Sequence, residues 1–151
     1  MIIGIILITL GIFVYFKFVK TNPNTKFEST EIKIGQDIYS MEIAKSPSQL
    51  SLGLGNRQNL CSKCGMIFVF PFEGILPFWM KDTQIPLDMI WINSKKEIVS
   101  IQTASVETDS PDFKLQMYKN DSPAKFVIEL NANTAKQLNL KVGDKLDIPN
   151  L

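Results

Sequence analysis

The sequence contains no histidine and only one arginine among its 151 residues. The absence of histidine excludes the usual base of Ser-His-Asp and Cys-His catalytic arrangements, and it removes the commonest metal ligand. No GxSxG, P-loop or GxGxxG motif occurs either, so the sequence indicates no nucleotide or other cofactor. Enzymes that use only Asp, Glu, Lys or Tyr remain open, although they leave no recognisable motif here.

An excess of positive charge is also missing from most of the chain. Residues 31–151 carry 13 basic and 14 acidic side chains. A domain that binds nucleic acid needs a basic footprint that releases counterions from the phosphates. We therefore expect no nucleic-acid partner.

A long apolar run stands at the N-terminus. Residues 2–16 contain no charged side chain, and Phe18 and Val19 continue the run beyond Lys17. About 18 residues in a helix span roughly 27 Å, close to the ~30 Å hydrocarbon core of a bilayer. The run lacks the charged start and the small-residue cleavage site of a signal peptide. The pattern predicts a transmembrane anchor over residues 1–20, which makes the membrane a partner.

The remaining chain divides into a linker and one domain. Residues 21–30 are polar, contain one proline and show no apolar periodicity, which is typical of a linker. Residues 31–151 are long enough to form a single globular domain with its own core.

Short β-strands dominate the predicted domain. Alternating apolar and polar residues on both sides of the Gly35 turn predict a hairpin, and Ser46-Pro47 provides an N-cap and a first-turn proline for a short helix. A long polar connection is expected over residues 104–123, and connections of that length are often functional. Further strands are predicted at residues 66–70, 78–81, 89–93, 98–103, 125–130 and 145–148, with a second short helix at residues 134–138.

Three segments together resemble the DUF192 (UPF0127) family: GLGNRQNL at 53–60, CGMIFVFPF at 64–72 and LPFWMKDTQIPLDMIWIN at 76–93. The family pattern contains GLM-x-R, GMLF and FWMKNT-x-IPLD. This chain departs from it at Asp82, which replaces an asparagine, and at Cys64, which precedes the GMLF element. The similarity covers residues 38–149. It implies an α+β, β-rich fold, a curled sheet or small barrel with two short helices, and it implies no established activity.

Two signals conflict over the side of the membrane on which the domain lies. Lys17, Lys20 and Lys26 follow the apolar run, and the positive-inside rule then favours a cytoplasmic domain. The family resemblance favours export, because members commonly carry export signals. We expect a domain tethered on the extracytoplasmic side of the cell membrane.

Cys61 and Cys64 are the only two cysteines, and they are separated by two residues. This spacing allows a disulfide, or it allows both sulfurs to bind one metal ion. A zinc site would need carboxylates or a second chain to complete four ligands, and a thioredoxin-type centre would need a helix where Gly65 begins a strand. In an oxidising compartment we expect a structural disulfide and no metal.

Arg57 is the lone arginine, and its planar guanidinium suits a carboxylate or phosphate partner. It matches the arginine of the family pattern, so it is a candidate for ligand binding. The alternative is an internal salt bridge to Asp88 or Glu129. Those two carboxyls are themselves candidates, either as parts of a pocket or as a general acid and base, which requires a defined separation.

Trp79, Lys81 and Thr83 complete the set of candidate residues. Alternation along a strand at 78–81 would place Trp79 and Lys81 on one face. A tryptophan beside a lysine offers stacking area and a polar anchor, as in surfaces that bind sugars or anions. The alternative is a core tryptophan past which the lysine extends.

Three functions from different classes follow from these residues. The leading hypothesis is a membrane-tethered envelope module that binds a glycan or protein partner through Arg57, Trp79, Lys81, Thr83 and Asp88. The second is a glycan-acting hydrolase or transferase that uses Asp88 or Glu129. The third is a thiol-redox or metal-linked protein that works through Cys61 and Cys64.

Overall fold

The computed structural model describes residues 25–107 and 110–151 of the chain. The predicted anchor, residues 1–20, and the first part of the predicted linker lie outside the described residues. Across the described ranges, no helix has both the length and the apolar character needed to cross a membrane.

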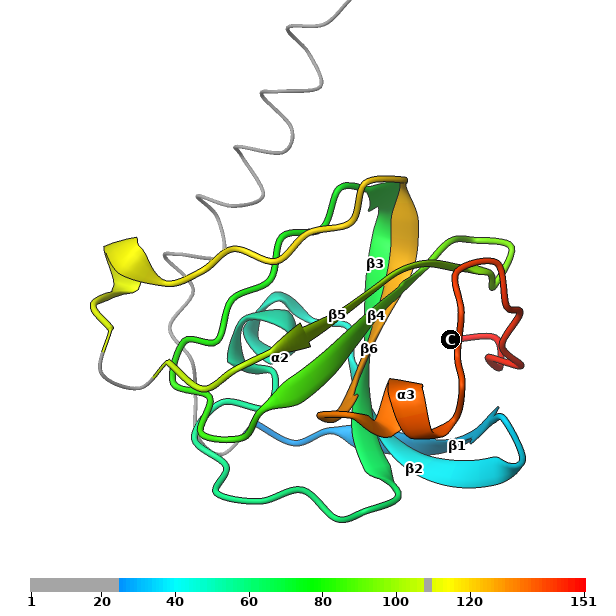
Figure 1. Cartoon of the computed structure of the whole chain (residues 1–151), viewed down its shortest axis with the longest axis horizontal. Coiled ribbons are helices and arrows are strands. Elements are labelled where there is room, and N and C mark those ends of the chain that lie inside the picture. The colour runs from blue at the N-terminus through cyan, green and yellow to red at the C-terminus, as the bar shows by residue number, and fades with distance from the viewer. Residues whose placement is uncertain (1–24, 108–109) are drawn as a thin grey trace, which may run out of the picture.

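The domain is built on a mixed six-stranded sheet with the order β1-β2-β3-β6-β4-β5. Figure 1 shows the strands strongly twisted, with α2 and α3 on opposite sides of the sheet. The elements in chain order are β1 (Glu28–Ile34), β2 (Asp37–Ala44), α2 (Pro47–Leu52), β3 (Cys64–Gly74), β4 (Leu87–Ile92), β5 (Ile98–Ala104), the 3-10 helix η1 (Asp112–Lys114), β6 (Ala124–Asn131) and α3 (Thr134–Gln137).

Local sequence explains the first half of this order. Gly35 adopts a φ of 63° in the tight turn that joins β1 to β2, a conformation that costs glycine little. Ser46 caps α2 by accepting from the backbone N–H of Gln49, while the Gln49 side chain returns to the Ser46 backbone. This crossover lets β3 run parallel to β2. The predicted hairpin and first helix are therefore confirmed.

The sheet carries an apolar cluster on each face. The face that packs against α3 and the C-terminal segment holds Ile90, Ile128 and Leu146, whereas the face under α2 holds Phe68, Met89 and Trp91. Successive residues of β4 alternate between the two clusters, yet all six are buried. A strand covered on both faces explains the nearly continuous apolar run in this part of the sequence.

The predicted β-rich α+β domain with two short helices is confirmed, but of the two predicted forms of the sheet the small barrel is not found. Among the described residues β1 and β5 do not pair, so the sheet remains open. The segment at 145–148 is not a strand: it forms single bridges from Asp147 to Lys33 and from Lys145 to Glu97. These two bridges connect the C-terminal segment to the two edges of the open sheet, at β1 and just before β5. The strand-like alternation of residues 145–148 is therefore explained by this link between the two edges.

The predicted strand at 78–81 is also wrong. Phe78 makes one antiparallel bridge with Tyr118, and the chain then turns at Asp82, where φ is 54°. Pro77 and Pro86 flank this stretch and remove backbone donors that a ladder would need. The segment therefore forms an ordered loop over the α2 face.

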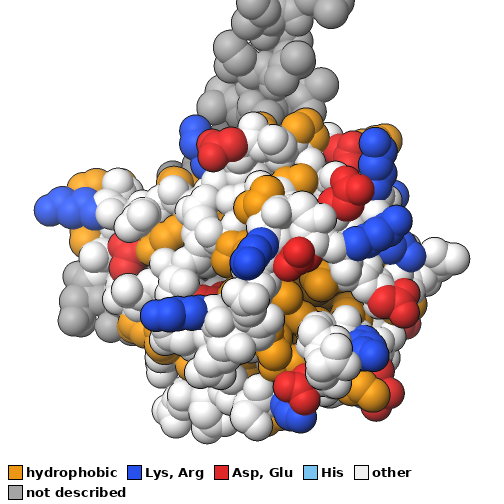
Figure 2. All heavy atoms as spheres, turned by 45° about the vertical axis from the view of Figure 1, so that its right-hand side comes forward, with side chains coloured by type: hydrophobic (Ala, Val, Ile, Leu, Met, Phe, Trp, Pro, Cys, Tyr) orange, Lys and Arg blue, Asp and Glu red, His pale blue; other side chains and the backbone are white. Residues whose placement is uncertain are grey.

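The exposed surface has mixed charge. Figure 2 shows basic and acidic side chains interspersed over one side of the molecule, with hydrophobic side chains between them. The most exposed aromatic side chains of the core domain are Phe72 and Phe113, at 80% and 83%.

Candidate functional site

The lone arginine is held beside the sheet by an ion pair with a strand residue. Arg57 Nη2 lies 2.5 Å from a carboxylate oxygen of Glu42 on β2, and both side chains are about one third exposed. The sequence analysis named Asp88 or Glu129 as the salt-bridge partner of Arg57, and the partner is instead Glu42. Sequence reasoning missed Glu42 because it occupies an ordinary polar position in the alternating pattern of β2.

The loop that carries Arg57 is tied to the loop of residues 76–86. Asn56 adopts a φ of 64°, and its backbone N–H donates to the carbonyl oxygen of Asp82 at 2.7 Å. Two regions that resemble the family, one around Arg57 and one around Lys81, therefore meet over the same face of the sheet.

Glu129 lies in the middle of that face. It is paired in register with Met66 on β3 and with Met89 on β4, and its side chain is only 4% exposed. Burial raises the pKa of Glu129 to about 8, and the positive charge of Arg57 lowers it in part. Among the described residues no hydrogen bond to its carboxyl contributes to that pKa. Glu129 is thus a buried carboxyl surrounded mainly by apolar side chains.

A small cavity of about 40 Å³ lies between Glu129, α2 and the loop above. Its size is sufficient for a few water molecules or one small chemical group. Its walls combine leucine and aromatic side chains with four polar residues. The lining residues are Leu50, Ser51, Leu52, Gly53, Leu54, Phe68, Phe78, Trp79, Lys81, Thr83 and Glu129.

Lys81 and Trp79 lie together, although no strand places them there. The Lys81 ammonium is 5.6 Å from the centroid of the Trp79 ring and forms an ion pair with Asp112 of η1. Thr83 is 6% exposed, and its hydroxyl donates to the Lys81 carbonyl oxygen at 3.1 Å. The turn at 80–83 brings together the three residues that the sequence singled out in this segment.

A second cavity, of about 230 Å³, adjoins the first and shares Lys81 with it. Its lining is polar, and Glu107 accepts there from the backbone N–H of Gln116 at 3.1 Å. The lining residues are Asn56, Lys81, Asp82, Gln84, Glu107, Ser110, Asp112 and Leu115. The expectation that the long connection at 104–123 is functional drew attention to this segment but did not identify Glu107 or Asp112.

Asp88 is separated from this group by the sheet. It pairs with Leu130, next to the Met89–Glu129 pair, so its side chain points to the opposite face. Its carboxylate accepts from the Thr103 hydroxyl at 2.7 Å and from the Ala135 backbone N–H at 2.8 Å. Asp88 therefore connects β4 to β5 and to the start of α3, and it does not line the cavity.

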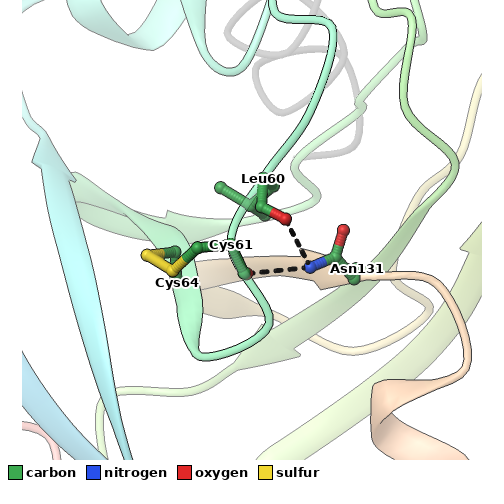
Figure 3. The surroundings of a disulfide bond; sticks show 4 residues. All are labelled: Leu60, Cys61, Cys64 and Asn131. Atoms are coloured by element: carbon green, nitrogen blue, oxygen red, sulfur yellow. Dashed lines mark hydrogen bonds between the residues drawn. A yellow bond between two sulfur atoms is a disulfide. The ribbon is translucent and has the colours of Figure 1, made fainter.

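The two cysteines form a disulfide at the entrance to β3. Figure 3 shows the Cys61–Cys64 bond beside Asn131, whose side-chain amide donates to the carbonyl oxygens of Leu60 and Cys61 at 3.2 and 3.0 Å. Lys63, between the cysteines, forms an ion pair with Asp37 at 2.8 Å. The loop is thus fixed to both β6 and the start of β2, as expected for a structural disulfide.

The candidate residues on the α2 face gather around a cavity. In the two described ranges, no group of three or more His, Cys, Asp or Glu residues is placed to hold a metal ion. The α2 face combines a cavity, a buried carboxyl and two cationic side chains: Lys81 lines the cavity, and Arg57 acts on Glu129 through its charge.

Two solved structures share this fold. A protein from Sinorhizobium meliloti 1021, provisionally described as a transcription regulator, is 28% identical with a TM-score of 0.71, covering 82% of this chain and 96% of that one. A protein of unknown function from Novosphingobium aromaticivorans DSM 12444 is 24% identical with a TM-score of 0.70, covering 85% and 91%. This second likeness supports the fold alone.

Comparison with protein-family models assigns this chain to a family. No curated protein matches the chain. The DUF192 family model, described as "Uncharacterized ACR, COG1430", matches residues 29–148, which include β2 to β6, the cavity and the disulfide. The chain therefore belongs to the DUF192 family, whose function is not established.

Proposed function

We propose that this protein is a membrane-tethered envelope module that binds a small group of its ligand in the cavity above Glu129. The observation that carries the proposal is a carboxyl that is 4% exposed and lines a cavity together with aromatic, leucine and polar side chains. A buried polar group without a protein partner costs stability, and such groups are concentrated at functional sites.

The composition of the cavity supports ligand binding. Small-molecule sites are typically concave and apolar, with a few polar groups that orient the ligand. Here the polar groups are Glu129, Thr83, Ser51 and Lys81, whereas leucine and aromatic side chains form the rest. Trp79 and Lys81 at the border offer stacking area and charge, which suits a glycan or a peptide segment as the ligand.

The proposed location rests on the sequence. The apolar run at residues 2–16 would place the domain beside a membrane, where tethering raises its effective concentration near envelope partners. The Cys61–Cys64 disulfide is compatible with an oxidising compartment. Labelling of intact cells with a membrane-impermeant maleimide tests this. We expect labelling only after reduction; labelling only in lysed cells without reductant would instead place reduced thiols in the cytoplasm.

Ligand binding is tested by closing the cavity. We would titrate the full chain in detergent micelles with a soluble digest of cell-envelope glycans and peptides, and measure the melting temperature. Leu50→Trp places a bulky side chain at the cavity wall, whereas Ile38→Trp makes a comparable change at a site that is 56% exposed. We expect the digest to stabilise the wild type and Ile38→Trp but not Leu50→Trp. An equal shift in all three, or none, would contradict the proposal.

Glycan hydrolysis is a second candidate, favoured by one observation. A general acid needs a raised pKa, and burial gives Glu129 a pKa of about 8. Asp88 cannot be its partner across a glycosidic bond, because it lies on the other face of the sheet. If Glu129 is catalytic, Glu129→Gln should reduce turnover of an envelope glycan by orders of magnitude while leaving binding largely intact.

A further inference from the structure

The charges around the cavity are unequally matched. Arg57 is paired with Glu42, and Lys81 is paired with Asp112. Glu129 has no ion-pair partner among the described residues, although Arg57 acts on it from a distance. Each of these two cations therefore has its own carboxylate, and the ionisable group left without a salt-bridge partner among the described lining residues is the carboxyl of Glu129.

The walls of the cavity suit a cation. Phe68 and Phe78 meet edge to face with ring centroids 4.9 Å apart, and both line the cavity together with Trp79. Aromatic faces attract ammonium groups through their quadrupole. The chain already shows this at the border, where the Lys81 ammonium lies 5.6 Å from the Trp79 ring centroid.

The dimensions limit the group that can enter. A cavity of about 40 Å³ can hold an ammonium with its attached methylene, since on the order of 10–15 Å³ of such space is enough for one water. The Thr83 hydroxyl and the Ser51 side chain also line the space, and they are the kinds of group that orient an N–H donor.

We infer that the cavity binds a primary ammonium group of the ligand, and that Glu129 is the carboxylate that receives it. This inference rests on the proposed binding function and names the chemistry of its ligand. The same ammonium chemistry is offered by a free polyamine, by a lysine side chain in a peptide and by an amino sugar.

Binding of a cation should be linked to proton release. The charged groups that face Glu129 are Arg57 after α2, Glu42 on β2, and Lys81 with its partner Asp112; Met66 and Met89 on the adjacent strands are neutral. Burial raises the pKa of Glu129 to about 8, so near neutral pH the ammonium must displace a proton, which passes to solvent. The affinity should therefore rise with pH, by up to about tenfold per unit below that pKa.

The experiment is a calorimetric titration of the full chain in detergent micelles. The probes are cadaverine, Nα-acetyl-lysine methylamide and glucosamine, each compared with its N-acetylated counterpart, in which no ammonium remains. The first two are titrated at pH 6.5 and 7.5, and glucosamine at one pH because its amine is a weaker base. The probe that binds most tightly distinguishes the three sources.

The variants are Glu129→Gln and, as a matched control, Glu31→Gln on the exposed side of β1. We expect at least one amine to bind tenfold or more tightly than its acetylated form, to gain affinity at the higher pH, and to lose it in Glu129→Gln but not in Glu31→Gln.

Two other results would overturn the inference. Equal or tighter binding of an acetylated probe, weakening as pH rises, would show a protonated Glu129 that binds neutral groups; the cavity would still be a ligand site. If no probe binds, the ammonium assignment fails, and the digest titration with Leu50→Trp decides separately whether the cavity binds any ligand.

Discussion

The two faces of the sheet each bury one carboxyl, and they treat it in opposite ways. Asp88 is 1% exposed and accepts hydrogen bonds from Thr103 and from the backbone of α3. Glu129 is 4% exposed, faces a cavity, and has its pKa raised to about 8 by burial. Asp88 is therefore a carboxylate that stabilises the fold through its hydrogen bonds, whereas Glu129 is a carboxyl that the fold leaves available to a ligand in the cavity.

The largest effect is expected from the satisfied carboxylate. Asp88→Ala leaves the buried Ala135 N–H without its acceptor, whereas the hydroxyl of Thr103, an exposed residue, can donate to water instead. A buried hydrogen bond to a charged group is worth about 1.5–3 kcal/mol and the exposed one less, so we expect the free energy of unfolding to fall by roughly 2–4 kcal/mol. Urea denaturation measures it. A loss below about 1 kcal/mol would show that the two carboxyls do not differ in this way.

The next effect is a pH dependence with a defined sign. Glu129 has a pKa of about 8 in the folded protein and 4.5 as its ordinary value, so the folded state binds more protons between these limits. Stability should therefore fall as pH rises through this window, by at most about 1.4 kcal/mol per unit.

Substitution isolates that contribution. Glu129→Gln removes the titrating group, so its unfolding free energy should vary less between pH 6 and pH 8 than that of the wild type, and it should exceed the wild type at pH 8. Urea denaturation at both values measures it, with Glu31→Gln as the control. The same pH slope in both variants would contradict the assignment.

A smaller effect on stability is expected from a substitution at Gly65, whose closest side-chain contacts lie on the Asp88 face of the sheet. A Cβ at Gly65 would lie 2.6 Å from the Glu129 carbonyl oxygen and 2.7 Å from the Met41 and Leu130 side chains, which belong to that face. Gly65→Ala should cost about 1–3 kcal/mol through overpacking, measured by urea denaturation. Gly74→Ala, on the same strand with nothing within 4 Å, should change stability little. Equal effects would indicate that the close contacts relax freely.

The smallest effect should come from the disulfide, which belongs to neither face. Cys61 and Cys64 close a loop with a sequence separation of 3, and the chain-entropy model then gives about 2 kcal/mol or less. Asn131 and Lys63 continue to hold the loop after the bond is removed. The double Cys→Ser variant should therefore have an unfolding midpoint at only a slightly lower urea concentration than the wild type. A large loss would show that the bond supports the whole sheet.

Part of the fold followed from local sequence. The hairpin around Gly35, the capped helix after Ser46 and the strands containing Met66 and Ile128 were predicted because turn residues, caps and alternation act over a few positions. The predicted strands at 78–81 and 145–148 failed because a short alternating run does not reveal whether a neighbouring strand is available to pair with it.

The candidate site was predicted only as a set of residues. Sequence reasoning grouped Arg57, Trp79, Lys81, Thr83 and Asp88. The structure brings the first four to one face with Glu129, whereas Asp88 lies on the opposite face. It missed Glu42 and Asp112, the partners of the two cations, because ion pairs between distant segments leave no local signal.

The sequence by itself determined the family, the β-rich character, the helix caps and the residues available for chemistry. Only the tertiary structure decided what each carboxyl does. In β4 and β6 the register pairs Met89 with Glu129 and Asp88 with Leu130, and neighbouring positions on a strand point to opposite faces. A shift by one residue would exchange those faces, and such a register is fixed by packing across the whole sheet, which no single segment encodes.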